Sequence, residues 1–98
     1  MDEKELKIIN HFGLRNQLKK LNEECYELIE AIIDFEDDNA SNSTKENIIE
    51  EMADVMVLLR QFQEYYNITD IDIAFKMLYK TNRTLERIES GYYERLGK

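Results

Sequence analysis

Four acidic residues stand in two pairs that share one spacing, Glu24 with Glu27 and Glu51 with Asp54. Side chains three positions apart lie on the same face of an α-helix, so each pair can direct two carboxylates at one point. If the two helices face each other, the four carboxylates converge, and they cannot all stay ionised without a counter-charge. A hard divalent cation supplies that charge. Mg²⁺, with Mn²⁺ as an alternative, is the expected metal, and Mg²⁺ brings phosphate chemistry with it.

A row of basic residues follows later in this acidic chain. Its members are spaced by four, three and four positions, which places them on one stripe of a helix: Lys76, Lys80, Arg83 and Arg87. The simpler interpretation is an exposed face, or salt bridges to acids on a neighbouring helix. The functional one is a clamp for phosphate oxygens, in which arginine offers forked donors and lysine a point charge. Together, a cation site and a cationic row match a triphosphate with its Mg²⁺.

Two further polar residues precede the first acidic pair. Gln17 and Lys20 lie about two turns and one turn before Glu24, on the same side of the helix. They either contact a bound nucleotide or belong to the surface.

The apolar pattern predicts four helices that must position these side chains, at about residues 3–12, 14–35, from residue 43 to 66, and 71–89. The second is the clearest, because apolar residues recur in steps of four and three from Leu14 to Phe35. Short connections should make adjacent helices antiparallel. We therefore expect an all-α fold, a four-helix domain of bundle type completed by homo-oligomerisation.

The expected helix ends rest on capping residues. Gly13 should end the first helix, and Ser43 with Glu46 fits a capping box that opens the third. Thr69 or Asp70 is the expected N-cap of the fourth. The tail from residue 91 onward is expected to be a loose end or an oligomer contact.

When each helix is projected along its axis, the paired acids lie on a different face from the neighbouring acids. Glu24 and Glu27 border the leucine stripe, and Glu51 and Asp54 lie beside Leu58. Other acids, Glu23, Glu30 and Glu50 among them, point further round toward solvent. Acids beside an apolar stripe are common in helical proteins, and either pair alone is more often a solvated edge. Two matching pairs on consecutive helices favour a metal site.

Size and charge limit the classes of function. The chain has 98 residues and no proline, which fits one small domain of long helices spanning residues 1–98. The net charge of −8 argues against duplex nucleic acid as the main partner, because phosphate backbones require a positive surface. The chain shows no apolar run of transmembrane length and no signal peptide, so we expect a cytoplasmic protein with no membrane partner. A homodimer or homotetramer would cover the remaining apolar faces.

The segments 17–32, QLKKLNEECYELIEAI, and 48–59, IIEEMADVMVLL, resemble the MazG-like all-α nucleoside triphosphate pyrophosphohydrolases. These share a superfamily with dimeric dUTPases and dCTP pyrophosphatases. Their pattern EExxE, a spacer and ExxD is met by Glu23, Glu24 and Glu27 and then by Glu51 and Asp54. The resemblance extends over about residues 14–90. The compact chain is similar to the short phage and Gram-positive versions of the family.

The resemblance implies Mg²⁺-dependent cleavage of an NTP or dNTP between the α and β phosphates, giving a nucleoside monophosphate and pyrophosphate, as a nucleotide-pool housekeeping activity. By similarity, the two acidic pairs would bind the metal and carry catalysis. Lys80 and Arg83 would contact the phosphates, with Arg87 and Lys76 as further candidates, and Gln17 as a nucleotide contact. A water would attack the α-phosphorus.

Two alternatives of other classes remain open at this stage. A di-iron carboxylate site needs Glu-x-x-His on two helices, and the only histidine, His11, follows Ile8 by three positions. A non-catalytic helical interaction module, or a nucleotide-binding module of the same fold, explains the stripes and the acidity without catalysis. Pyrophosphate release from a panel of NTPs and dNTPs separates these alternatives.

Overall fold

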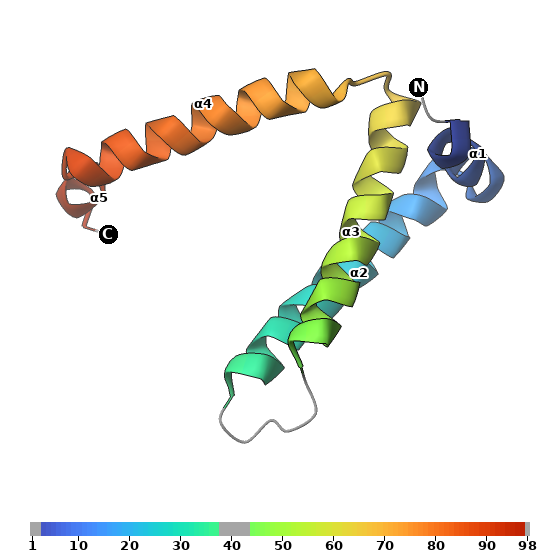
Figure 1. The fold of residues 1–98 in the computed structure, drawn as a ribbon, viewed down its shortest axis with the longest axis horizontal. Coiled ribbons are helices and arrows are strands. Elements are labelled where there is room, and N and C mark those ends of the chain that lie inside the picture. The colour runs from blue at the N-terminus through green and yellow to red at the C-terminus, as the bar shows by residue number, and fades with distance from the viewer. Residues whose placement is uncertain (1–2, 38–43, 98) are drawn as a thin grey trace. The chain divides into compact units, whose positions relative to one another are not determined.

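The computed structural model describes residues 3–37 and 44–97, and this part of the chain is helical with short connections. The helices are α1 Glu3–Phe12, α2 Leu14–Glu36, α3 Lys45–Tyr65, α4 Asp70–Glu89 and the short α5 Tyr92–Arg95 (Figure 1). The predicted all-α class and the four long helices are confirmed. Two compact units divide the chain, Met1–Asn67 and Ile68–Lys98, and each is described by itself.

The break between α1 and α2 is a single glycine. Gly13 has a φ of 91°, in the region that residues with a side chain seldom adopt. Its N–H still donates to the carbonyl of Ile9, and its own carbonyl accepts from the N–H of Gln17. The chain can therefore change direction here without losing these backbone hydrogen bonds.

Side-chain caps open α3 and α4. The hydroxyl of Thr69 accepts from the N–H of Asp72 at 3.1 Å, and the Asp72 carboxylate accepts from the N–H of Thr69 at 3.3 Å. This capping box confirms Thr69 as the N-cap of α4. At α3 the N-cap is Thr44, whose hydroxyl accepts from the N–H of Asn47 at 3.2 Å. The prediction of Ser43 as the cap was therefore wrong by one residue, and Ser43 itself lies outside the described residues.

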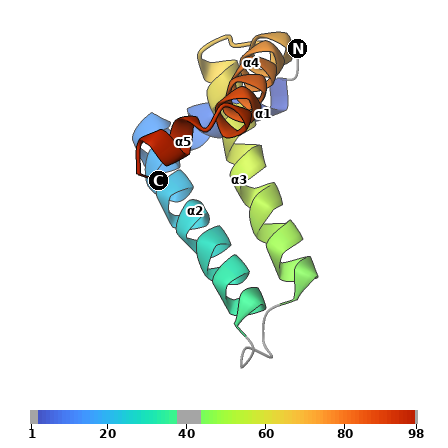
Figure 2. The same cartoon turned by 90° about the vertical axis from the view of Figure 1, so that its left-hand side faces the viewer.

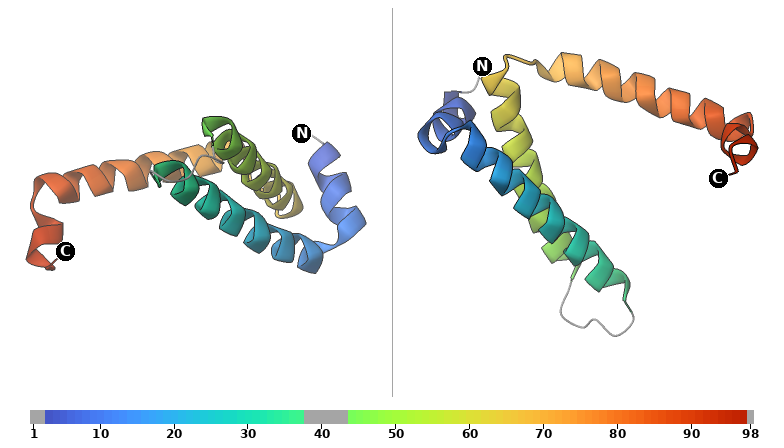
Figure 3. Two further views of the ribbon diagram at one scale, coloured as in Figure 1. Left: turned by 90° about the horizontal axis from the view of Figure 1, so that it is seen from below. Right: turned by 180° about the vertical axis from the view of Figure 1, so that it is seen from behind.

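The first unit is a pair of antiparallel helices with a third across one end. Helices α2 and α3 run side by side, and α1 packs against both where α2 begins and α3 ends (Figures 2 and 3). Ile9 of α1 is fully buried at this junction, and Leu58 of α3 is 4% exposed. An ion pair between Arg60 and Glu5, at 3.8 Å, also joins α3 to α1.

The apolar stripe of α2 is only partly covered. Leu21, Cys25 and Leu28 are half-buried, whereas Leu18 and Phe35 are exposed. The buried side chains of α2 are polar: Gln17 and Glu24. Gln61 of α3 is buried as well. Buried polar groups cost free energy unless they are paired, and these side chains do have partners: Gln17 bonds to Gln61, and Glu24 pairs with Lys20.

The second unit consists of α4 and α5. The predicted loose tail contains α5, which is linked back by a hydrogen bond of 2.6 Å from Arg95 Nη1 to the Ser90 carbonyl. No residue of α4 is buried, and its apolar side chains, Ile71, Phe75, Leu78, Leu85 and Ile88, are more than half exposed. Of the helices in the described part of the chain, none is both long and apolar enough to cross a membrane.

Candidate metal centre

Three of the four predicted carboxylates meet between α2 and α3. Glu24, Glu51 and Asp54 each offer an oxygen that lies within 4.8 Å of the other two. The antiparallel pairing brings the middle of α2 opposite the first half of α3, and the spacing of three places Glu51 and Asp54 on one face. We call these three residues the carboxylate triad.

Two atoms of the triad suit a cation. Glu24 is only 7% exposed, and Glu51 is half-buried. The Oε2 atoms of both residues are enclosed and have no hydrogen-bond partner among the described residues. Buried carboxylate oxygens without partners are costly, and a hard divalent ion satisfies them directly. The residues present therefore fit Mg²⁺ or Mn²⁺.

Glu27 lies beside the triad. It is exposed and is not among the three residues whose oxygens cluster. Its interaction with the Glu24 side chain, followed by repulsion from the Glu24 charge, raises the pKa of Glu27, and Glu51 adds to this effect. The structure thus brings all four predicted acids into one electrostatic group, with Glu27 at its edge.

The pKa values of Glu24, Glu27 and Glu51 are not shifted in the same direction. Burial first, and then the charges of Glu24 and Asp54, raise the pKa of Glu51. Burial alone would raise the pKa of Glu24 as well, but the side chains of Glu27 and Lys20 outweigh it, so the pKa of Glu24 lies below its usual value. Within this interacting group the pKa values of Glu27 and Glu51 are thus raised, while that of Glu24 is lowered.

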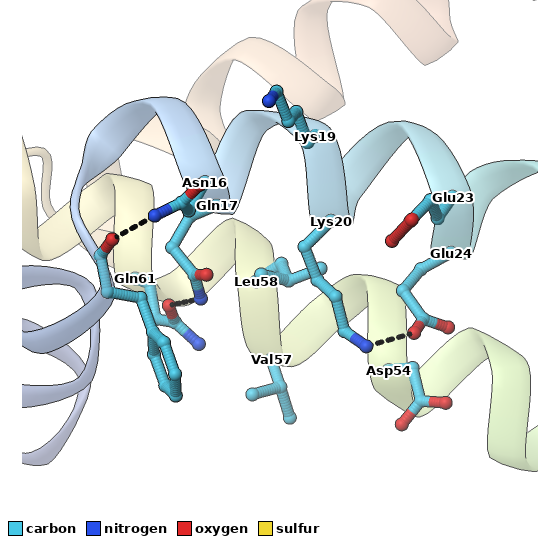
Figure 4. A pocket seen from close by; sticks show the side chains of 11 residues that line it. Asn16, Gln17, Lys19, Lys20, Glu23, Glu24, Asp54, Val57, Leu58 and Gln61 are labelled. Atoms are coloured by element: carbon cyan, nitrogen blue, oxygen red, sulfur yellow. Dashed lines mark hydrogen bonds and ion pairs between the residues drawn. The ribbon is translucent and has the colours of Figure 1, made fainter.

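A cavity of about 650 Å³ adjoins the triad within the first unit, at the size typical of small-molecule sites. Figure 4 shows Glu24 and Asp54 at one end and the side chains of Gln17 and Gln61 at the other. Lys20 lies between them, with its Nζ atom 3.2 Å from Oε1 of Glu24. The lining residues are Phe12, Asn16, Gln17, Lys19, Lys20, Glu23, Glu24, Asp54, Val57, Leu58 and Gln61.

The predicted basic row lies on α4, in the second unit. Lys76 and Lys80 are exposed, while Arg83 and Arg87 are half-buried. The guanidinium of Arg83 lies 5.5 Å from the Tyr79 ring centroid, and that of Arg87 lies 4.7 Å from the Tyr92 ring centroid. These contacts orient both arginines. The Nε atom of Arg83 is enclosed and has no hydrogen-bond partner among the described residues.

Gln61 lines the cavity and was not predicted from the sequence, although a signal for it exists. Gln61 follows Asp54 by seven positions, just as Gln17 precedes Glu24 by seven. In antiparallel helices these equal offsets place both glutamines on the same side of the acids and at the same level. Gln61 is also a polar residue on the face that carries Leu58. Its position required the pairing of α2 with α3 to be taken into account.

Comparison with known protein families agrees with this geometry. The family described as the MazG nucleotide pyrophosphohydrolase domain matches residues 12–87, which include the carboxylate triad, the two glutamines and the basic row. No curated protein matched the chain, and no solved structure matched it. The match extends over well more than half of the sequence, and the chain belongs to the MazG nucleotide pyrophosphohydrolase domain family.

Proposed function

We propose that the protein is a Mg²⁺-dependent nucleoside triphosphate pyrophosphohydrolase that converts an NTP or dNTP into the monophosphate and pyrophosphate. The observation that carries the proposal is the carboxylate triad, with two enclosed and unpartnered oxygens, inside a chain of this family. The cavity beside the triad has room for a nucleoside.

In this proposal Glu24, Glu51 and Asp54 hold the metal, and Glu27 is the fourth carboxylate that can bind it. When bound, Mg²⁺ neutralises charge on the triphosphate and makes water a better nucleophile at the α-phosphorus. The raised pKa of Glu27 supports it as the group that accepts a proton from the attacking water.

The basic row supplies the contacts to the phosphates. Arg83 and Arg87 are held by aromatic rings, and the unpartnered Nε atom of Arg83 leaves a donor for an anion. Lys76 and Lys80 add exposed positive charge on the same helix. These residues stabilise the pyrophosphate as it leaves, from the same chain or from a second copy.

The working form of the protein in this proposal is a homodimer or homotetramer in the cytoplasm, where nucleotide pools are maintained. The large apolar side chains exposed along α4 support it, because a second copy would remove them from water. Light scattering on the purified protein measures the mass directly. A monomer at micromolar concentration contradicts this part of the proposal.

The test of the activity is a panel of NTPs and dNTPs incubated with the protein and Mg²⁺, scored for pyrophosphate and monophosphate. We expect at least one nucleotide to yield both products in equal amounts, and EDTA to stop the reaction. Binding without turnover would instead identify a nucleotide-binding module of the same fold. A nucleoside diphosphate and orthophosphate as products would contradict cleavage between the α and β phosphates.

A further inference from the structure

The two glutamines at the far end of the cavity are joined to each other. Gln17 Nε2 donates to Gln61 Oε1 at 2.8 Å, and both side chains are buried. This bond uses one donor of the first amide and one acceptor of the second. Gln17 Oε1 can still accept and Gln61 Nε2 can still donate. Within the described residues neither atom makes another hydrogen bond, so each keeps its capacity for one.

The cavity that contains this amide pair has both apolar and polar lining. Val57 and Leu58 of α3 line it together with Phe12. Asn16, Lys19 and Lys20 line it as well. This end therefore combines apolar side chains with one remaining amide acceptor and one remaining amide donor. Apolar contact and neutral hydrogen-bonding groups suit a planar heterocycle that carries donors and acceptors on its edge.

We propose that the Gln17–Gln61 amide pair recognises the pairing edge of the nucleobase of the substrate, and that it fixes the direction in which the nucleotide enters the cavity. The inference rests on the proposed function and adds a base subsite to it. Every nucleobase carries hydrogen-bond donors and acceptors on that edge, and the remaining oxygen of Gln17 can accept while the remaining nitrogen of Gln61 can donate.

The distances along α2 agree with this orientation. Seven residues separate Gln17 from Glu24, which is about 10.5 Å along the helix axis. The span from the edge of a base, through the sugar, to the α-phosphate is of this order. With the base at the glutamines, the α-phosphate lies at the carboxylate triad, and the ribose lies along Lys20.

The competing explanation is that the amide pair only ties α2 to α3. Replacing both glutamines separates the two roles, because apolar side chains of similar size can fill the space without leaving an unpaired amide. The variant is Q17L/Q61L. Its matched control is Asn22→Leu, which removes an amide from an exposed position of α2 outside the cavity.

Binding is measured by calorimetry with Mg²⁺ and the α,β-methylene analogues of ATP, GTP, CTP and UTP, which cannot be cleaved at the scissile position. Inorganic tripolyphosphate serves as the ligand without a base. We expect the wild-type protein to bind its best analogue at least about tenfold more tightly than tripolyphosphate. In Q17L/Q61L the ratio of the affinity for this analogue to the affinity for tripolyphosphate should fall by at least about fivefold. The affinity for tripolyphosphate itself should not change. Asn22→Leu should keep the wild-type ratio.

A second variant covers the case in which Q17L/Q61L does not fold. Gln61→Glu keeps an oxygen that can accept from Gln17 Nε2, but it replaces the free donor by an acceptor. We expect the order of preference among the four analogues to change. An unchanged ratio of analogue to tripolyphosphate affinity in folded Q17L/Q61L overturns the base subsite, and so does an unchanged order of preference among the four analogues in Gln61→Glu. Neither result would affect the proposed pyrophosphate release by the wild type. If the wild type binds neither the analogues nor tripolyphosphate, the proposed function itself fails.

Discussion

Lys20 holds one oxygen of the most buried carboxylate in the triad. Its Nζ atom lies 3.2 Å from Oε1 of Glu24, one helical turn further along α2, while Oε2 of Glu24 is enclosed and unpartnered. The ammonium group thus acts as an internal counter-charge, and in the proposed metal site it would compete with the cation for Glu24. It also helps to keep the pKa of Glu24 below its usual value.

Removal of Lys20 should therefore strengthen metal binding in the absence of nucleotide. We expect Lys20→Met to increase the affinity for Mg²⁺ by about three- to tenfold, because a positive charge next to the site is lost. Isothermal titration calorimetry measures this. Lys19→Met is the matched control, since Lys19 points away from the triad (Figure 4). Equal Mg²⁺ affinities in wild type and Lys20→Met would show that Lys20 does not compete with the metal.

Stability should depend on pH through Glu27 and Glu51. Their pKa values are raised above the ordinary 4.5, so the folded protein binds these two protons more tightly than the unfolded chain does. Lowering the pH from about 7 to about 5 should therefore stabilise the metal-free protein through these groups. The pKa of Glu24 is lowered, so its contribution to stability has the opposite sign. That contribution is lost as the pH falls below about 4.5 and through the pKa that Glu24 has in the folded protein.

Thermal unfolding in EDTA and in saturating Mg²⁺ tests this dependence. Protons and cation compete for the same carboxylates, so stabilisation by Mg²⁺ should shrink as the pH falls. In the variant E27Q/E51Q, most of the difference between the unfolding temperatures in Mg²⁺ and in EDTA should disappear. Unfolding temperatures that change with pH in the same way with and without Mg²⁺ would contradict the assignment of these groups.

Much of this arrangement could be predicted from the sequence. The helix ranges followed from apolar spacing and from Gly13 and Thr69, which have physical reasons to end or begin a helix. Projection correctly made Glu24 and Glu51 less exposed than Glu23 and Glu50, whereas Glu27 and Asp54, which it also placed beside apolar surface, are exposed. The start of α3 was misplaced by one residue because Ser43 and Thr44 are both good caps.

Other features could not be predicted from the sequence, because they depend on how the helices pair. The ion pair of Glu5 with Arg60 and the bond of Gln17 with Gln61 join residues that are more than forty positions apart, so no local pattern shows them. The leucine stripe of α2 predicted a buried apolar core. The structure instead places polar side chains, Gln17 and Glu24, at the most buried positions of that helix.

The junction of α1 with the helix pair depends on Ile9, which is fully buried. Ile9→Ala should lower the free energy of unfolding by about 2–4 kcal/mol, from lost burial and the cavity that remains. Urea unfolding followed by circular dichroism measures the change. Ile8→Ala, at a partly exposed position of the same helix, should cost less than about 1 kcal/mol. Equal losses in both variants would contradict this account of the core.

The basic row should affect phosphate binding and not base preference. We expect Arg83→Ala and Lys80→Ala to lower kcat/KM by about tenfold to a hundredfold for every nucleotide in the panel, because each removes a charge-assisted contact to the phosphates. Lys7→Ala removes an exposed positive charge from α1 and serves as the control. Steady-state kinetics that leave Arg83→Ala and Lys80→Ala at the wild-type value would remove α4 from the site.

The most direct test of the central claim follows the reaction in isotopically labelled water, with the wild type and with Glu51→Gln, in the presence of Mg²⁺. Attack at the α-phosphorus places the labelled oxygen in the nucleoside monophosphate, and mass spectrometry of the products locates it. We expect label in the monophosphate and none in pyrophosphate for the wild type. Folded Glu51→Gln should show turnover reduced by at least about a hundredfold. Label in pyrophosphate, or full activity in Glu51→Gln, would contradict a pyrophosphohydrolase that works through the carboxylate triad.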